Sequence, residues 1–336
     1  MAFAGRRRLC GNGSLRYGRD DKGGDGRREG FGSKLPKQQR LAGQGERVSA
    51  DVVTVEADGV PVRLREDHDF SFLGELGSVF CVFDEQDSGN VCFGLDTGVE
   101  RLFVKYAGAK TIRAYDGPED AVRRLKEAMP VYEALRHPAV VELRQHFPTA
   151  DGYAAVFAWF PGEVLHPRWS PALGESVVPT DFPSYRHQQL PMDKRLRTLD
   201  TIFAFHEHVA ARGFVAIDFY DGCILYDFAR HVTMICDIDM YARRPYTNGM
   251  GRMWGSTHFM SPEEFTLGAA LDEVTNVFTM GAAAFVLLGG GKDRSLDRWE
   301  AGPARHEVAC KAVSEDRSQR HASIAAFRRA WDEAEG

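Results

Sequence analysis

Residues 215–225 read VAIDFYDGCIL, and residues 235–239 read ICDID. Each stretch is an apolar run followed by an aspartate, Asp218 in the first and Asp237, nineteen residues later, in the second. A carboxylate at the end of an apolar strand is unusual unless it is paired or binds a cation. Phosphoryl transfer needs two such groups, one to orient an acceptor hydroxyl and one to hold the magnesium that bridges nucleotide phosphates. The two residues could also be turn aspartates at strand ends, so the surrounding sequence has to decide.

The charge of the chain is unevenly distributed. Of its 336 residues, 43% are hydrophobic and 27% are charged, which is ordinary globular composition. Residues 1–47 carry twelve Lys and Arg against five Asp and Glu, a surplus of seven positive charges, so a net charge of −6 leaves −13 on the remainder. We expect residues 1–49, rich in Gly and Arg, to be a disordered basic tail because they cannot bury a core. A basic arm for nucleic acid or lipid, a spacer and wrongly included upstream codons remain alternatives for this tail.

The rest of the chain is expected to form one acidic domain, residues 50–336. No stretch reaches the roughly 18 apolar residues that span a bilayer, and the richest run, residues 277–291, is broken by glycines. The six cysteines lie far apart, without a CxxC pair or zinc-type spacing. We therefore expect a soluble cytoplasmic protein without a membrane span, and we do not expect nucleic acid as a partner.

The first part of this domain has strand-like patterns and the second has helix-like patterns. Runs rich in Val and Phe, joined by polar turns, predict antiparallel strands at residues 52–55, 60–64, 77–83, 90–95 and 101–105. Asp58-Gly59 is a hairpin signal between the first two. A helix is predicted from Pro118, which is followed by acidic residues.

Further strands are predicted at residues 140–143 and 153–157. Residues 165–191 are polar and without a clear period, so we expect a surface insertion there. Residues 192–211 have a broad apolar helical face, and a short strand pair is expected within residues 215–234. The predicted class is α+β, with a β-rich part containing one main helix, a connector, and a mostly helical part.

In order along the chain, residues 72–331 resemble the protein-kinase-like superfamily, in particular bacterial serine/threonine protein kinases. Residues 88–91 (SGNV) resemble the tip of the loop that covers the phosphates, with Gly89 at its turn. Lys105 resembles the third-strand lysine that contacts the α- and β-phosphates. Residues 157–163 (FAWFPGE), which include Trp159, resemble the connector whose backbone binds adenine.

The resemblance implies a two-lobed fold, with a β-rich N-lobe at about residues 50–160 and a mostly helical C-lobe at about 161–336. It implies ATP and Mg²⁺ as cofactors, Asp218 as the catalytic aspartate, and Asp237 as a metal ligand. Residues 135–141 (LRHPAVV) are similar to the segment that leads into the fourth strand.

Later segments extend the resemblance. Residues 255–263 (GSTHFMSPE) are similar to the segment that closes the activation region, and its Glu263 is expected to pair with Arg320 in a buried bidentate contact. Residues 276–281 (NVFTMG) are similar to a buried helix that anchors the catalytic loop. The helix glutamate that pairs with Lys105 is expected to be Glu127, with Glu133 as the less favourable alternative.

The sequence also departs from the family pattern. Asp84 and Gln86 stand where the first two loop glycines are usual, and Ile217 replaces the arginine before the catalytic aspartate, which argues against control by phosphorylation of the activation segment. Tyr220 stands where a lysine steadies the γ-phosphate, and Cys223 stands where an asparagine binds a second magnesium.

A thiol is a poor ligand for magnesium. Either one metal ion therefore suffices, or Asp221 or Asp239 supplies the missing oxygen.

Three functions follow from this pattern. The first is an ATP-dependent phosphotransferase that acts on a Ser/Thr hydroxyl of a protein, favoured by residues 255–263, which resemble a peptide-receiving surface. The second is a small-molecule kinase similar to aminoglycoside and choline phosphotransferases, favoured by the Asp237-Ile238-Asp239 string and the insertion at 165–191. The third is a catalytically inactive nucleotide-binding scaffold, favoured by Ile217, Cys223 and the acidic loop.

Overall fold

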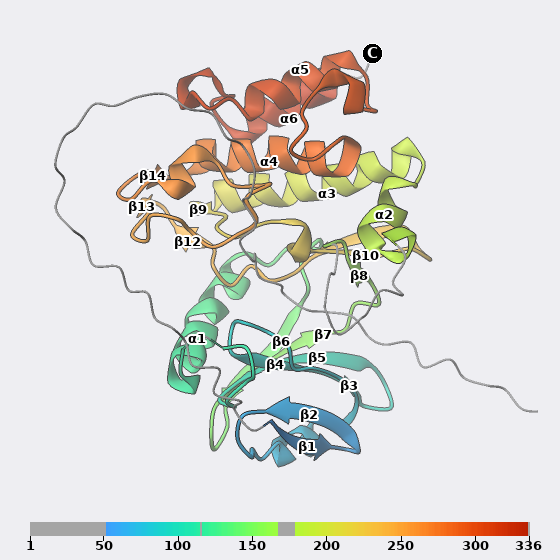
Figure 1. The fold of residues 1–336 in the computed structure, drawn as a ribbon, viewed down its shortest axis with the longest axis vertical. Helices are drawn as coiled ribbons and strands as arrows, with labels where there is room; N and C mark the ends of the chain where they lie inside the picture. Colours follow the sequence, from blue (N-terminus) through green and yellow to red (C-terminus); the bar gives the residue numbers. More distant parts are fainter. Residues whose placement is uncertain (1–51, 115, 167–178, 335–336) are drawn as a thin grey trace, which may run out of the picture.

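The strands and the helices of the molecule gather at opposite ends. The computed structural model describes residues 52–114, 116–166 and 179–334, and the expected tail, residues 1–49, lies outside them. Figure 1 shows a sheet at one end with α1 beside it, and α3 to α6 stacked at the other end. The described chain is thus an α+β structure with a five-stranded antiparallel sheet and six α-helices. We call residues 52–158 the sheet region and residues 179–334 the helical region.

The main sheet has the strand order β3-β4-β5-β7-β6, antiparallel throughout. Its strands are β3 (Ser78–Phe83), β4 (Asn90–Asp96), β5 (Arg101–Ala107), β6 (Leu143–Pro148) and β7 (Tyr153–Ala158). A separate hairpin, β1 (Val53–Ala57) and β2 (Val60–Leu64), turns at Asp58 and Gly59, whose φ angles of 51° and 75° are those that the Asp-Gly signal predicts. The hairpin packs on the sheet through an apolar cluster that includes Val62, Leu64 and Phe93.

Helix α1 (Pro118–Ala134) begins at the predicted proline, with Glu119 and Asp120 in its first turn. It packs against β5 and β7, and its Leu125 and Met129 are each 1% exposed. These apolar residues recur every three to four positions, so one face of the helix closes the core beneath the sheet.

The strand predicted at residues 140–143 is displaced, because β6 begins at Leu143. Val140 and Val141 pair instead with the helical region: the Val141 N–H donates to Ile235 O at 2.9 Å, and the Ile235 N–H donates to Ala139 O at 2.7 Å. Apolar β-branched residues indicate a strand-like backbone, but they do not say which neighbour the backbone pairs with.

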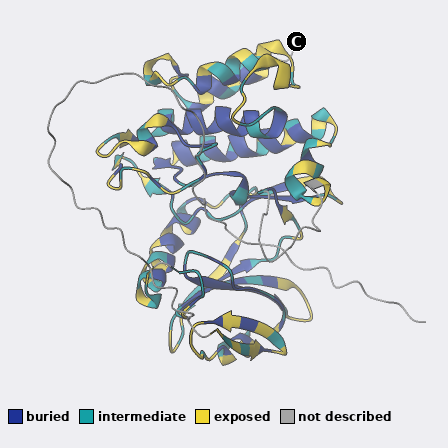
Figure 2. Ribbon diagram, in the orientation of Figure 1, coloured by how far each residue is buried: buried dark blue, intermediate teal, exposed yellow. Residues whose placement is uncertain are grey.

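The helical region is organised around one almost entirely buried helix. Its helices are α2 (Pro183–Gln188), α3 (Met192–Ala211), α4 (Glu273–Leu288), α5 (Pro303–Ala312) and α6 (Ile324–Glu333). Helix α3 has the predicted bounds. Helix α4 is apolar on all sides, so it lies at the centre, with α3, α5 and α6 packed against it; Figure 2 shows it almost entirely as buried.

The segment predicted to be an irregular surface insertion, residues 165–191, is partly ordered into helix α2. His187 of this helix is fully buried, and its ring meets the edge of Tyr226 with centroids 4.8 Å apart. The sequence signal for this helix is Pro183 at its first position. The helix is too short to show a clear apolar period. Residues 167–178 of the same segment lie outside the described residues.

Short strands connect these helices and present the candidate site. They are β8 (Glu163–Val164), β9 (Phe214–Val215), β10 (Ile224–Asp227), β11 (Val232–Ile235), β12 (Ala242–Arg243), β13 (Tyr246–Thr247) and β14 (Ala270–Leu271). The predicted strand pair within residues 215–234 is confirmed: β10 and β11 form an antiparallel hairpin that β8 extends. In the part of the chain that the structure describes, no helix has the length and apolarity to cross a membrane.

Candidate functional site

Both aspartates of the opening motif have an unusual backbone. Asp218 follows β9 with φ of 63°, and Asp237 follows β11 with φ of 56°. Left-handed backbone is uncommon for residues other than glycine and is concentrated at functional sites. The surrounding structure must therefore hold both residues in place.

Helix α4 anchors the segment before Asp218 through one side chain. The buried Asn276 side chain accepts the Ala216 N–H at 2.7 Å through Oδ1 and donates to Ala216 O at 2.8 Å through Nδ2. The amide therefore satisfies both backbone groups of one residue, two positions before Asp218. The expectation that residues 276–281 lie in a buried helix that anchors this loop is confirmed.

A buried histidine supports the same loop, and sequence reasoning missed it. His206 of α3 bonds to Ile202 O at 2.7 Å and to the Tyr241 hydroxyl at 2.9 Å, and its ring centroid lies 4.5 Å from that of Phe219. Burial lowers the pKa of His206 to about 4, so the ring is neutral and serves as a support. Its position on the apolar face of the helix predicted at 192–211 was the available signal.

Lys105 and Asp237 meet directly, although 132 positions separate them. Lys105 Nζ lies 2.7 Å from Asp237 Oδ1 and 2.9 Å from Asp239 Oδ2. Burial alone would lower the pKa of Lys105, but Asp237 and Asp239 outweigh it and hold that pKa well above its ordinary value. The structure thus joins β5 of the sheet region to the segment after β11 by a double ion pair on a charged lysine.

The remaining oxygen of Asp239 bonds to helix α1. The Tyr132 hydroxyl lies 2.7 Å from Asp239 Oδ1, and the Ile238 N–H donates to the same hydroxyl oxygen at 3.3 Å. Both carboxylate oxygens of Asp239 are therefore in hydrogen bonds within the protein. This favours Asp237 over Asp239 as the ligand of a cation.

The prediction that Glu127 pairs with Lys105 is wrong. The Glu127 side chain is exposed on α1, whereas Lys105 is enclosed and bonded to the two aspartates. Tyr132 lies five residues farther along the helix, which rotates it by roughly 140° relative to Glu127. The alternative, Glu133, is directed to His146 at 3.4 Å.

A cavity between the two regions has apolar walls and one charged end. Lys105, Asp237 and Trp159, three of the predicted site residues, line it together. The Trp159 ring meets Phe80 at a centroid distance of 5.0 Å, and the backbone N–H of Trp159 donates to Arg101 O at 3.1 Å. The other walls include Phe103, Val141, Phe157, Ala158 and Leu225.

The loop between β3 and β4 is held at both ends. Gly89 turns at φ of 81° and lies against α1, where an added Cβ would come within 3.0 Å of the Ala121 Cβ. Arg124 of α1 donates to Ser88 O at 2.9 Å. Gly89 does not line the cavity, but its neighbours Gln86 and Ser88 do.

At its first end, the same loop is fixed by the N-terminal hairpin. Arg63 of β2 binds Asp84 through Nε at 3.0 Å to one oxygen and Nη2 at 2.8 Å to the other. Asp84 is thus paired with Arg63 and is not among the residues that line the cavity. The sequence indicated its charge but not its partner.

Asp218 and Cys223 lie beside the Lys105 ion pairs. Burial, followed by the nearby carboxylate of Asp237, raises the pKa of Asp218 well above its usual range. Burial also raises the pKa of the Cys223 thiol, which donates to Asp218 O at 3.4 Å and to Asp237 O at 3.8 Å. The neutral thiol therefore joins the backbones of the two aspartate segments.

Asp221, the other candidate for a second metal oxygen, is also paired. Its Oδ1 lies 2.6 Å from His166 Nδ1, and both side chains are largely buried. The partner comes from just after β8, 55 positions away, and no local spacing in the sequence indicated it.

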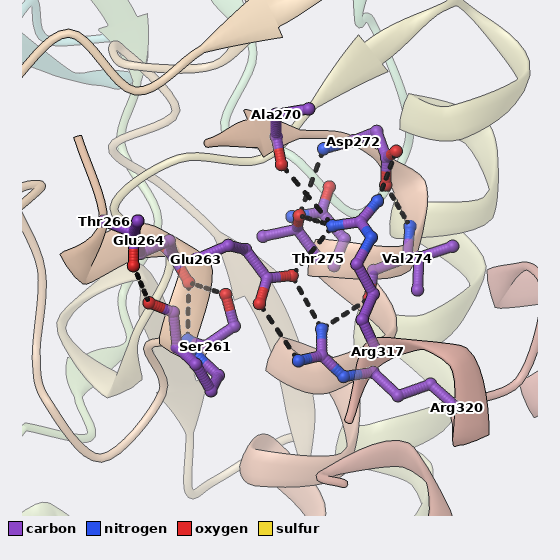
Figure 3. Close-up of polar contacts among 12 residues, drawn as sticks. Ser261, Glu263, Glu264, Thr266, Ala270, Asp272, Val274, Thr275, Arg317 and Arg320 are labelled. Atoms are coloured by element: carbon purple, nitrogen blue, oxygen red, sulfur yellow. Dashed lines mark hydrogen bonds and ion pairs between the residues drawn. The ribbon is translucent and has the colours of Figure 1, made fainter. Parts of the chain in front are cut away.

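The predicted pairing of Glu263 with Arg320 is confirmed (Figure 3). Arg320 Nη1 donates to Oε1 at 2.7 Å and Nη2 donates to Oε2 at 3.0 Å, which is the bidentate geometry. Arg317 adds a contact of 3.0 Å to Oε1. Burial opposes the charge on Glu263, but the Arg320 hydrogen bond prevails and lowers the pKa of the carboxyl.

Comparisons with known proteins found no relative of this chain. No protein-family model matches the chain, and no curated protein matches it significantly.

Proposed function

We propose that this chain is an ATP- and Mg²⁺-dependent phosphotransferase with a two-lobed protein-kinase-like fold, and that it phosphorylates a Ser/Thr hydroxyl of a protein. In this proposal Lys105 neutralises nucleotide phosphates, Asp237 holds the cation and Asp218 orients the acceptor hydroxyl. The sheet region corresponds to the N-lobe and the helical region to the C-lobe.

One observation carries the proposal. Lys105 of the sheet and Asp237 of the helical region meet at 2.7 Å at the charged end of an apolar cavity. Asp218 lies close enough that Asp237 raises its pKa. A phosphate-binding cation and a metal-binding carboxylate at one cavity, with a second carboxylate nearby, are the groups that phosphoryl transfer requires.

The chemistry of the cavity suits a nucleoside phosphate. Phe103, Phe157 and Trp159 provide an apolar surface for a flat base, and Lys105 provides a positive charge in the same cavity. The net charge of −13 after residue 47 repels an anion, and Lys105 is itself paired with two carboxylates, so binding depends on Lys105 together with a cation at Asp237.

The residues also fit a magnesium ion that is shared with a nucleotide. Within the described residues, no group of three or more His, Cys, Asp or Glu could hold a metal ion. Magnesium commonly uses one or two carboxylates together with substrate phosphates, so Asp237, whose side chain is 40% exposed, is an appropriate ligand. The bound ion would neutralise charge on the phosphates.

The surroundings of Asp218 support a protein substrate. Gly255, at the start of the segment that resembles a peptide-receiving surface, lies against it: an added Cβ would be 3.4 Å from Asp218 Oδ1. Trp254 is 49% exposed and Phe265 is 43% exposed at the two ends of this segment. Exposed apolar side chains that flank this segment suit an extended peptide.

The test compares wild type with Asp218→Asn in the presence of labelled ATP and Mg²⁺. Removal of a group that acts on the acceptor proton typically costs 10²–10⁴-fold in rate, and we expect a loss of about that size. Asp332→Asn, at a 60% exposed side chain of α6, is the matched control and should retain full activity. Equal phosphate incorporation in wild type and Asp218→Asn would contradict the proposal, and metabolite-dependent ADP release without protein labelling would identify a small-molecule kinase.

An inactive nucleotide-binding scaffold is the second candidate. The observation in its favour is Cys223, a neutral buried thiol that bonds to two backbone carbonyls where a metal-binding amide is usual in the family. Calorimetry that shows ATP binding without any turnover, with or without Mg²⁺, would select this alternative.

A further inference from the structure

Asp239 lies between the site lysine and helix α1. Its Oδ2 accepts from Lys105 Nζ at 2.9 Å, and its Oδ1 accepts from the Tyr132 hydroxyl at 2.7 Å. Its side chain is 20% exposed, against 40% for Asp237. Asp237 is among the residues that line the cavity, and Asp239 is not.

The Tyr132 ring is fixed independently of its hydroxyl. Tyr132 is 4% exposed, and its ring meets Phe157 of β7 at a centroid distance of 4.9 Å and an interplanar angle of 61°. The hydroxyl is therefore delivered to Asp239 by a ring that the core holds in place. Removing the hydroxyl alone leaves this packing intact.

The two ion pairs of Lys105 have different consequences when a nucleotide binds. A cation at Asp237 would compete with Lys105 for that carboxylate. Asp239, whose oxygens are both committed within the protein, can keep its contact to the lysine. The lysine then remains oriented by Asp239 alone.

We propose that Tyr132 is a positioning residue that holds Asp239, and that Asp239 in turn orients Lys105 toward the phosphates of the nucleotide. This inference rests on the proposed function and deepens it. Glu127 was predicted to connect helix α1 to the lysine. In this proposal, Tyr132 and Asp239 together make that connection. Asp239 is then an anchor for the lysine, and Asp237 is the ligand of the cation.

The experiment measures ATP affinity by calorimetry, with Mg²⁺ and without it, for wild type, Tyr132→Phe, Asp239→Asn and the double variant. A hydrogen bond to a charged group is typically worth a factor of about 10 to 100, so each single variant should weaken affinity at least roughly tenfold. The loss should be equal with and without Mg²⁺, because the lysine contacts phosphate in both cases. The double variant should bind no more weakly than the single variants, because one chain of contacts is broken.

Two controls separate positioning from loss of structure. Tyr226→Phe removes another buried hydroxyl, which bonds to His231 Nδ1 at 3.0 Å, and should leave ATP affinity unchanged. Asp237→Asn should lose affinity mainly where Mg²⁺ is present. Urea unfolding of each variant checks that the fold is retained.

The outcomes are distinguishable. Failure of wild type to bind ATP would overturn the proposed function and this inference with it. If wild type binds and Tyr132→Phe binds equally well, only this inference is overturned. A loss in Asp239→Asn that is confined to Mg²⁺, or losses that multiply in the double variant, would likewise overturn it.

Discussion

Two ion-pair clusters of the molecule each have three charged residues, with the signs of the charges reversed. Glu263 lies between Arg320 and Arg317, and Lys105 lies between Asp237 and Asp239. In the first cluster the Arg320 side chain is 0% exposed and Glu263 10%, whereas in the second Asp237 is 40% exposed. The Glu263–Arg320 pair of the first cluster is enclosed by protein, with Arg317 at its 34% exposed edge, whereas the second cluster opens on the cavity.

The Glu263–Arg320 ion pair therefore contributes to the stability of the fold, whereas the partners of Lys105 are open to exchange with a ligand. Arg320 also donates to Ser314 O at 2.8 Å and to Val274 O at 3.3 Å, so the protein satisfies its donors. A buried ion pair with complete hydrogen bonding is costly to break because one charge is left without compensation. Under the proposed function, a nucleotide phosphate would replace Asp237 as a partner of Lys105, while Asp239 keeps its contact to the lysine.

The largest expected effect follows from breaking the enclosed cluster. Arg320→Met leaves Glu263 buried without its bidentate partner and should lower the free energy of unfolding by about 3–5 kcal/mol. Urea denaturation measures this change. Arg317→Met, at a side chain that is 34% exposed, is the control and should cost about 1 kcal/mol or less. Equal losses in the two variants would show that enclosure does not distinguish the two arginines.

A second test uses the buried neighbour of Glu263. Burial raises the pKa of Glu264 from 4.5 to about 7, so the folded state keeps its proton at a pH where the unfolded state has lost it. The stability that this group contributes is full below about pH 4.5 and is lost as the pH rises to about 7, by roughly 3 kcal/mol in total.

Glu264→Gln should make unfolding free energy less dependent on pH over that interval. Urea denaturation at several pH values compares the two slopes. An unchanged slope in Glu264→Gln would assign the pH dependence to other groups.

Removing the central charge of the Lys105 cluster should affect stability little and ATP binding strongly. Lys105→Met should lower the free energy of unfolding by only about 1–2 kcal/mol, because water reaches Asp237 and screens the remaining carboxylates. It should nevertheless abolish ATP binding that calorimetry detects in wild type. A stability loss as large as that of Arg320→Met, with ATP affinity retained, would reverse the assignment of the two clusters.

The smallest expected effect concerns the thiol between the two aspartate segments. Cys223→Ser keeps a donor for Asp218 O, so unfolding free energy should change by about 1 kcal/mol or less. Thermal or urea unfolding checks this, and ATP affinity should stay within roughly twofold. A larger loss of affinity would mean that the thiol itself acts in the site.

The sequence could predict groups that lie at fixed places along the chain. Asp218 and Asp237 end apolar strands, and Pro118 begins a helix, so local patterns were sufficient for both. The Glu263–Arg320 contact followed from the resemblance of its two segments to a known family.

Partners across the fold were not predictable in the same manner. Glu127 was chosen by its spacing along α1, but the rotation of that helix against β7 brings Tyr132 to the site instead. The contacts of Arg63 with Asp84 and of His166 with Asp221 depend on how separate elements pack, and a single sequence carries little signal for such packing. The same limit explains the displaced strand at residues 140–143.

The pairing of Ala139 and Val141 with Ile235 has a mechanical consequence. It fixes the chain just beyond the end of α1 to the strand that leads into Asp237. Any swing of α1 then has its fulcrum there, and displacement grows with distance along the helix. Tyr132 lies near the fulcrum, whereas Arg124 lies eight residues farther out, roughly 12 Å along the axis. A tilt that barely disturbs the Tyr132–Asp239 contact would thus move Arg124, and with it the end of the β3–β4 loop that Arg124 holds at Ser88 O.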